Sequence, residues 1–256
     1  MAIRWTTAIL DYPAEEFDRG SAFWQAVTAS GISGPAGERA EFVTLLPADG
    51  DPFLCARRLH GGAPGCHLDV HADDVPACAA QAEHLGATVI GEPGGYVVLR
   101  SPGGLRFCVT GHDGERKRPA PVSWPGGQDS LVDQLSVDVS PGCYGRECEF
   151  WYGLTGWPQF PGSRPEFIFL GRPAGMPLRL LLQRLDAPHA GLTRCTAHLD
   201  LACDNVPAET ARHQALGASL VRVVTDWTTL RDPAGLQYCI TRRNPVTGKL
   251  ASRSGH

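Results

Sequence analysis

An internal repeat is the feature that most constrains how this chain of 256 residues folds. Residues 67–110 align with residues 198–241 without a gap, and 18 of the 44 aligned pairs are identical. Both segments open with His-Leu-Asp, pass through Leu-Gly-Ala, and close with Leu-Arg-x-Pro-x-Gly-Leu followed by a final strand that contains a cysteine. A match of this length in one register indicates a structural unit that is present twice. The chain is therefore predicted to fold as two similar copies.

The upstream parts of the two copies match more loosely. Phe23-Trp24 pairs with Phe150-Trp151 at a slightly different offset. Between the copies, Arg116-Lys117-Arg118 is followed by prolines and glycines, which is typical of a connector. We therefore expect the following domains: residues 1–115, a linker at 116–130, residues 131–243, and a tail at 244–256.

Alternation of polar and apolar residues predicts the same elements in each copy: a βαβββ module that occurs twice. A Gly after a helical segment predicts the end of that helix, as at Gly217. In the second copy we expect strands at 134–139, 166–170, 178–185, 198–201, 221–224, 227–231 and 236–241, and helices at 145–154 and 206–216. The predicted fold class is α+β.

Composition limits the partners of the protein. Hydrophobic residues make up 43% of the chain and charged residues 20%, which allows a packed core. The net charge of −4 disfavours nucleic acid or an anionic membrane as the main partner. No apolar run reaches the roughly 20 residues of a membrane span, and the N-terminus does not resemble a signal peptide. We expect a cytoplasmic protein.

The nine cysteines include no Cys-x-x-Cys pair, which excludes zinc ribbons and thioredoxin-like sites. Most of them stand among apolar residues, so they are interpreted as small core residues, with one reactive thiol as the alternative. The sequence also lacks the glycine-rich nucleotide-binding motifs, the Gly-x-Ser-x-Gly of serine hydrolases and the His-Glu-x-x-His of zincins.

The repeated residues resemble the vicinal oxygen chelate superfamily, which includes glyoxalase I, extradiol dioxygenases and bleomycin-resistance-type binding proteins. The resemblance rests on the strand that opens with His-Leu-Asp, the helix that ends in Leu-Gly-Ala, and the turn before the last strand. It covers nearly the whole chain and implies two tandem glyoxalase-like domains. It leaves the function open, because one fold hosts many functions.

In enzymes of that superfamily, side chains from four strands hold a metal ion in a cleft. Strand alternation places the matching side chains of each copy on one predicted cleft face. These candidate ligand-binding residues are Gln134, Gln183, His198 and Gln237 in the second copy, and Thr7, Arg57, His67 and Arg106 in the first.

The position that holds a carboxylate in the superfamily's enzymes is Gln237 in one copy and Arg106 in the other. Neutral amides bind divalent ions weakly and guanidinium groups repel them. We therefore expect no cofactor, with a weakly held divalent metal in the C-terminal domain as the alternative if Asp200 or Asp138 turns inward. His67, Asp69 and His71 alternate along one strand in a pattern that suits a metal. The second copy has Ala202 in place of His71, so a hydrogen-bonded His–Asp pair is the preferred interpretation.

These observations predict a protein that binds a small organic molecule without a tightly bound metal, for resistance, sequestration or sensing. The alternative is a lyase, isomerase or dioxygenase that uses His198 as its catalytic residue, with a weak metal or with acid–base chemistry. The second copy is expected to be the main site, with Trp157 and Trp227 stacking on the ligand. The arginines of the first copy suit an anion, or they pair with nearby acids such as Glu41 and Asp69. Either a monomer or a homodimer fits.

Overall fold

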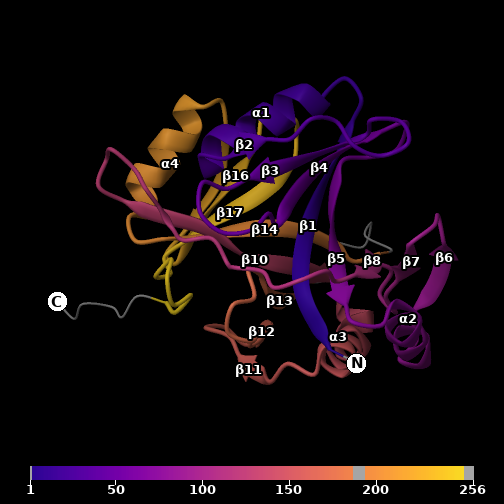
Figure 1. Ribbon diagram of the computed structural model, residues 1–256. Coiled ribbons are helices and arrows are strands. Elements are labelled where there is room, and N and C mark those ends of the chain that lie inside the picture. The colour runs from indigo at the N-terminus through magenta and orange to yellow at the C-terminus, as the bar shows by residue number, and fades with distance from the viewer. Residues whose placement is uncertain (1, 187–193, 251–256) are drawn as a thin grey trace. The chain divides into compact units, whose positions relative to one another are not determined.

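The computed structural model describes residues 2–186 and 194–250, and its elements follow the predicted order of four βαβββ modules (Figure 1). The first module consists of β1 (Ile3–Pro13), α1 (Phe17–Thr28), β2 (Gly31–Ile32), β3 (Phe42–Leu46) and β4 (Leu54–Leu59). The second consists of β5 (Gly65–Ala72), α2 (Val75–His84), β6 (Thr88–Gly91), β7 (Tyr96–Arg100) and β8 (Arg106–Gly111).

The second copy repeats this order after the short strand β9 (Val122–Ser123). Its first module consists of β10 (Asp129–Val139), the 3-10 turn η1 (Pro141–Cys143), α3 (Tyr144–Thr155), β11 (Gln159–Pro161), β12 (Phe167–Leu170) and β13 (Arg179–Arg184). Its second consists of β14 (Thr196–Cys203), α4 (Val206–Ala215), β15 (Ser219–Val224), β16 (Trp227–Arg231) and β17 (Gln237–Thr241).

Each copy forms one sheet, and the two sheets have equivalent strand orders. The first runs β2-β3-β4-β1-β5-β8-β7-β6, and the second runs β11-β12-β13-β10-β14-β17-β16-β15 with β9 beside β10. In both, the pairs β5–β8 and β14–β17 are parallel, because a helix and two strands return the chain to the same direction. The α+β fold is confirmed.

The compact units of the structure combine parts of both copies. The first unit holds the described residues of Met1–Ile9, Cys66–Lys117 and Leu135–Ala197, so it contains α2 and α3. The second unit holds those of Leu10–Gly65, Arg118–Gln134 and His198–His256, so it contains α1 and α4. Within each unit the two helices are neighbours, as Figure 1 shows for α1 beside α4 and for α2 beside α3. The domain boundaries given above remain predictions.

Each unit has an aromatic core made by both copies. In the second unit, Trp24 of α1 packs against Tyr238 of β17 with ring centroids 5.1 Å apart. In the first unit, the equivalent Trp151 of α3 packs against Phe107 of β8 at 5.3 Å. All four side chains are at most 1% exposed. Burial of such large rings supplies much of the apolar stabilisation of a small domain.

A buried carboxylate accepts the indole hydrogen in each core. Asp232 accepts from Trp24 Nε1 at 3.1 Å and from the Tyr12 hydroxyl at 2.6 Å. In the first unit Glu147 accepts from Trp151 Nε1 at 2.8 Å and from the backbone N–H of Gly103 at 2.7 Å. Burial raises the pKa of both carboxyl groups.

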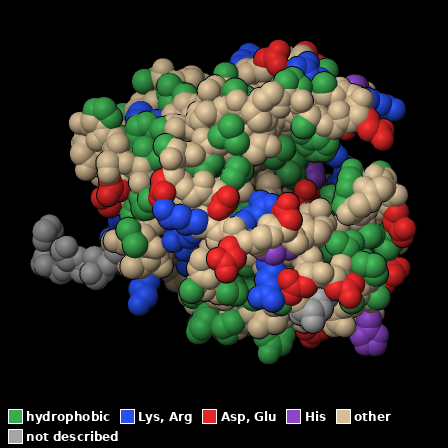
Figure 2. Space-filling view, viewed as in Figure 1, with side chains coloured by type: hydrophobic (Ala, Val, Ile, Leu, Met, Phe, Trp, Pro, Cys, Tyr) green, Lys and Arg blue, Asp and Glu red, His purple; other side chains and the backbone are tan. Residues whose placement is uncertain are grey.

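Most predicted elements of the second copy match observed ones, but β11 was not predicted and the strand expected at 134–139 begins at Asp129. The helix expected at 145–154 is Tyr144–Thr155, and the strand expected at 227–231 is Trp227–Arg231. None of the helices that the structure describes is long and apolar enough to cross a membrane. On the face shown in Figure 2, charged side chains of both signs are interspersed, in keeping with the small net charge.

Candidate functional site

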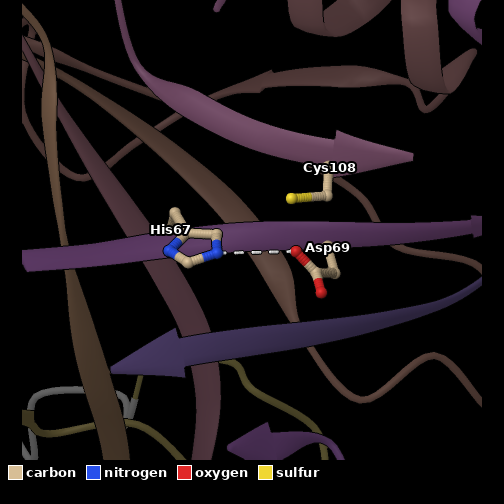
Figure 3. Close-up of side chains that lie close together, drawn as sticks. All are labelled: His67, Asp69 and Cys108. Atoms are coloured by element: carbon tan, nitrogen blue, oxygen red, sulfur yellow. Dashed lines mark ion pairs between the residues drawn. The ribbon is translucent and has the colours of Figure 1, made fainter. Parts of the chain in front are cut away.

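Two clusters of possible metal ligands stand out among the described residues, one in each copy. The first cluster consists of His67, Asp69 and Cys108, and the second consists of His198, Asp200 and Cys239. In each, one ligand atom from every residue lies within 4.8 Å of the others. Figure 3 shows the first cluster, in which Cys108 extends from a neighbouring strand toward the gap between His67 and Asp69.

The parallel strand pairs of the fold assemble these clusters. His198 and Asp200 are two residues apart on β14, so their side chains share a face of the sheet. Asp200 is the register partner of Cys239 on β17, which brings the thiol beside the carboxylate. The first copy uses the same arrangement, with Asp69 of β5 opposite Cys108 of β8. The clusters therefore follow from strand register.

The second cluster has distances that suit a bound cation. His198 Nε2 lies 3.4 Å from Asp200 Oδ1 and 3.8 Å from Cys239 Sγ. Bonds of about 2.0–2.3 Å to one metal ion place its ligands about 3.3–4.6 Å apart. The 3.4 Å separation is also longer than a normal N–H···O bond. The donor set of one imidazole, one carboxylate and one sulfur therefore fits a borderline ion such as Zn²⁺ or Fe²⁺.

The first cluster has a similar internal geometry, with His67 Nε2 3.7 Å from Asp69 Oδ1 (Figure 3). The two clusters differ in which of their side chains is exposed to solvent. The His198 side chain is 17% exposed and that of Asp200 5%. In the first cluster the His67 side chain is 4% exposed and that of Asp69 23%. An incoming molecule therefore meets the histidine in one cluster and the aspartate in the other.

Neighbouring residues also distinguish the clusters. In the second cluster, the Gln134 amide donates a hydrogen bond to Asp200 Oδ2. Burial raises the pKa of the Cys239 thiol, so without a metal this group is neutral. Thr229 Oγ1 lies 3.5 Å from the same sulfur. Apart from Asp200, the cluster thus has only neutral side chains among these neighbours.

The first cluster has a cation on the strand that carries its cysteine. Arg106 is two residues before Cys108 on β8, so both side chains leave the same face. Arg106 is the register partner of Arg100, and its Nε makes no hydrogen bond to any residue in the described part of the chain. The second copy has Gln237 and Arg231 at these positions. A guanidinium group so near disfavours a second cation.

The structure distributes the predicted residues of the second copy as follows. Gln134 is 2% exposed and contacts the cluster through Asp200, while His198 belongs to the cluster itself. Gln237 is exposed at the start of β17, and Trp227 is half-buried at the start of β16. Gln183 and Trp157 belong to the other compact unit, where Gln183 is half-buried and Trp157 is 4% exposed.

In the first copy, His67 belongs to the first cluster, and Thr7 Oγ1 lies 2.9 Å from Nε2 of His71. Burial lowers the pKa of His71 to about 4. Arg57 belongs to the other compact unit, where its Nε donates to Asp11 at 2.6 Å. Its charge is therefore balanced by a carboxylate that the sequence interpretation did not consider.

The sequence interpretation missed both cysteines of the clusters. They were interpreted as small core residues, and all nine cysteines are indeed free, with eight of them buried. The signal was nevertheless present in the repeat, because His67, Asp69 and Cys108 are identical to their partners in the ungapped alignment. Strand alternation also placed Cys239 on the same face as Gln237.

Comparison with known protein families agrees with the repeat. Residues 7–110 and residues 137–241 each match the model of a family described as glyoxalase-like domain. Together these two segments make up most of the chain. No curated protein matches the sequence.

Several solved structures share the fold at low sequence identity. The Mn(II)-bound glyoxalase from Novosphingobium aromaticivorans is 17% identical with a TM-score of 0.61, over 98% of this chain and 86% of that one. The 2,2',3-trihydroxybiphenyl 1,2-dioxygenase from Sphingomonas wittichii strain RW1 is 13% identical with a TM-score of 0.62, over 94% and 90%. A mutant of 4-hydroxymandelate synthase from Streptomyces coelicolor is 16% identical with a TM-score of 0.60, over 93% and 91%.

The expectation of no cofactor is wrong in the light of these findings. It gave the missing carboxylate at Gln237 and Arg106 the most weight, and it allowed a metal only if Asp200 or Asp138 turned toward His198. The structure instead brings Asp200 and Cys239 to His198, and one of the similar structures is a metal-bound glyoxalase. An aspartate two residues after the histidine, together with a thiol, supplies the anionic ligands that the interpretation sought mainly elsewhere.

Proposed function

The chain belongs to the glyoxalase-like domain family, and we propose that it is an enzyme that acts on a small organic molecule with a divalent metal ion. The observation that carries this proposal is the second cluster, where an imidazole, a carboxylate and a thiol have their ligand atoms within 4.8 Å. Two of its three members, Asp200 and Cys239, are buried. The proposal replaces the expected metal-free binding protein.

The second cluster is the better metal site of the two. Its near neighbours Gln134 and Thr229 are neutral, whereas the first cluster shares its face with the guanidinium group of Arg106, whose Nε has no hydrogen-bond partner among the described residues. Two positive charges about 7 Å apart, the spacing of alternate residues on a strand, repel each other. We therefore assign the metal to His198, Asp200 and Cys239.

Each residue of the second cluster has a distinct role in this proposal. Asp200 and the Cys239 thiolate neutralise the two charges of the ion, and Gln134 fixes the orientation of Asp200 through its hydrogen bond. The thiol gives up its proton when the ion binds, since the thiolate is the ligand. His198 is partly exposed, so it lies where a substrate enters. A metal at this point would polarise an oxygen atom of the substrate.

The class of reaction follows from the fold only in outline. The similar structures include a glyoxalase and dioxygenases, so a lyase, isomerase or dioxygenase reaction on a small polar molecule is the proposal. Trp227 is the predicted aromatic side chain that lies in the same compact unit as the second cluster. A cytoplasmic location remains the prediction, and nine free cysteines suit a reducing compartment.

Cobalt titration tests the assignment directly. Co²⁺ bound to a thiolate gives a charge-transfer absorption band in the near ultraviolet, which reports the ligand whether or not a substrate is known. We expect one equivalent of Co²⁺ to produce this band in the wild-type protein and in Cys108→Ser, and no band in Cys239→Ser. A band that is lost in Cys108→Ser and kept in Cys239→Ser would assign the metal to the first cluster. No band at all would refute the proposed metal site.

A further inference from the structure

A pocket lies in the same compact unit as the second cluster, and none of its lining residues belongs to either cluster. It has a volume of about 210 Å³ and lies between the end of α1, the β3–β4 loop, the connector before β9, and the strands β10 and β14. Cavities of that size are uncommon in protein interiors, where few voids exceed one water molecule. The space is therefore larger than an ordinary packing void.

The walls of the pocket are mainly apolar. Apolar lining residues from all of its elements include Val27, Leu45, Phe53, Leu54, Leu131 and Leu201. Pro47, Pro119 and Pro121 form further parts of the wall and have no backbone N–H to offer a ligand. Rigid walls with few donors favour a ligand that needs no hydrogen bonds.

The hydroxyl groups in the wall already have partners within the protein. Thr28 Oγ1 lies 2.7 Å from the carbonyl oxygen of Trp24 and 2.8 Å from Ser30 Oγ. Ser130 Oγ donates to Glu209 Oε1 at 2.7 Å and accepts from Trp124 Nε1 at 2.9 Å. A polar ligand would thus lose its bonds to water and gain none from these groups. The exposed carboxylate of Asp49 in the wall further disfavours an anion.

The pocket is separated from the second cluster by strand β14. Leu201 lines the pocket, and its neighbour Asp200 belongs to the cluster. Successive side chains of a strand point to opposite faces, so the pocket and the cluster lie on opposite sides of β14. A molecule in this pocket cannot reach the proposed metal ligands.

We infer that this pocket is a separate binding site for an uncharged apolar molecule of one or two rings. Its size supports that class, because an apolar cavity of about 150 Å³ already accommodates benzene. The inference does not depend on the proposed enzymatic function, since no residue is shared between the two sites.

Fluorine NMR of the full chain tests the inference with two matched probes. Fluorobenzene is apolar, and 4-fluorobenzoate adds only a charge to the same ring. We expect saturable line broadening of fluorobenzene by the wild-type protein and none of 4-fluorobenzoate. Equal binding of both probes, or no saturable binding of fluorobenzene, would overturn the inference.

Two variants that fill the pocket locate the bound probe. Ala48 and Ala120 are exposed residues in its wall, so Ala48→Phe and Ala120→Phe insert a ring from two sides with little effect on the core. Each is expected to weaken fluorobenzene binding at least tenfold, while Ala80→Phe on the exposed face of α2 leaves it unchanged. His198→Ala is also expected to leave it unchanged. Loss of binding in His198→Ala, or unchanged binding in both pocket variants, would refute the assignment.

Discussion

The chain contains two His–Asp–Cys clusters that can be compared directly with each other. Their three residues are identical, they sit at the same strand positions, and their histidine–aspartate distances differ by little, 3.7 Å against 3.4 Å. What differs is the surroundings, with Arg106 in the first cluster and Gln134 with Gln237 in the second. The comparison teaches that a ligand set alone does not define a metal site, because the nearby charge decides whether a cation is stable there.

Replacement of the aspartates should give the largest difference in Zn²⁺ affinity between the two clusters. Binding of structural zinc is worth about 10–16 kcal/mol shared among four ligands, so one ligand contributes about 3 kcal/mol, or roughly a hundredfold in affinity. Asp200→Asn should therefore weaken the first equivalent of Zn²⁺ about a hundredfold, and Asp69→Asn should leave it unchanged. Competition with a chelating dye measures both. Equal losses in the two variants would show that the clusters are equivalent.

The hydrogen bond from Gln134 to Asp200 provides the next largest effect. Loss of a residue that orients a metal ligand costs about 10- to 100-fold in affinity. Gln134→Ala should weaken Zn²⁺ binding by at least tenfold. Thr7, which occupies the equivalent position, contacts His71 and serves as the matched control. If Thr7→Ala weakens Zn²⁺ binding as much as Gln134→Ala does, Gln134 has no special role.

Arg106 and Gln237 stand two residues before the cysteines of the clusters. Exchanging these two side chains tests whether the nearby charge decides metal binding. Gln237→Arg should weaken Zn²⁺ binding by the second cluster about tenfold, because it introduces the repulsion proposed for the first. Arg106→Gln should strengthen binding of a second equivalent by a similar factor. Both affinities come from calorimetric titration at low and high salt. Factors that stay the same at high salt would contradict an electrostatic origin for these partly exposed positions.

The smallest expected effect concerns how two buried carboxyl groups, Glu147 and Glu209, make the free energy of unfolding depend on pH. Burial raises the pKa of Glu147, whereas hydrogen bonds from Arg212, His213 and Ser130 overcome burial and lower that of Glu209. As the pH rises above about 4.5, the unfolded chain releases the Glu147 proton first, so that stability is lost. Glu209 acts at lower pH and with the opposite sign: it gains stability as the pH rises toward about 4.5, where the unfolded chain loses this proton, and it loses that stability as the pH falls.

Denaturant unfolding from about pH 3 to pH 8 checks these signs, below about pH 4.5 for Glu209 and above it for Glu147. Glu147→Gln should make the free energy of unfolding rise more steeply with pH than in the wild type, and Glu209→Gln should make it rise less steeply. Each change stays below about 1.4 kcal/mol per pH unit, the limit for one proton. Slopes that change in the same direction in both variants would contradict the assigned pKa shifts.

Much of the fold could be predicted from local sequence patterns. The strand at Trp227–Arg231 and the helix around Phe150 follow from the spacing of apolar residues, which is a property of short segments. The pairing of Trp24 with Tyr238 could not be predicted in this way, because these residues are far apart in the chain and either copy supplies an equivalent partner. A repeat leaves that choice open.

The site was also predictable only in part, because some of its contacts join strands that are far apart in the sequence. His198 was found because it begins the ungapped repeat, with His67 as its partner, and Gln134 because alternation placed it on the cleft face. Cys239 was overlooked because a buried thiol and a thiol that binds metal look alike in sequence, and only the register of β14 on β17 tells them apart. The pocket behind Leu201 gave no signal, since its wall combines six segments of the chain.

The combination of both copies in each compact unit has a consequence for the order of events during synthesis. Residues 10–65 share a unit with residues 198–250, which the ribosome makes more than a hundred residues later. At about 5–20 residues per second, α1 waits roughly 10–40 seconds for Tyr238 to emerge and cover Trp24. During that time its apolar face is unprotected, so the first helix of the nascent chain is where a chaperone is needed.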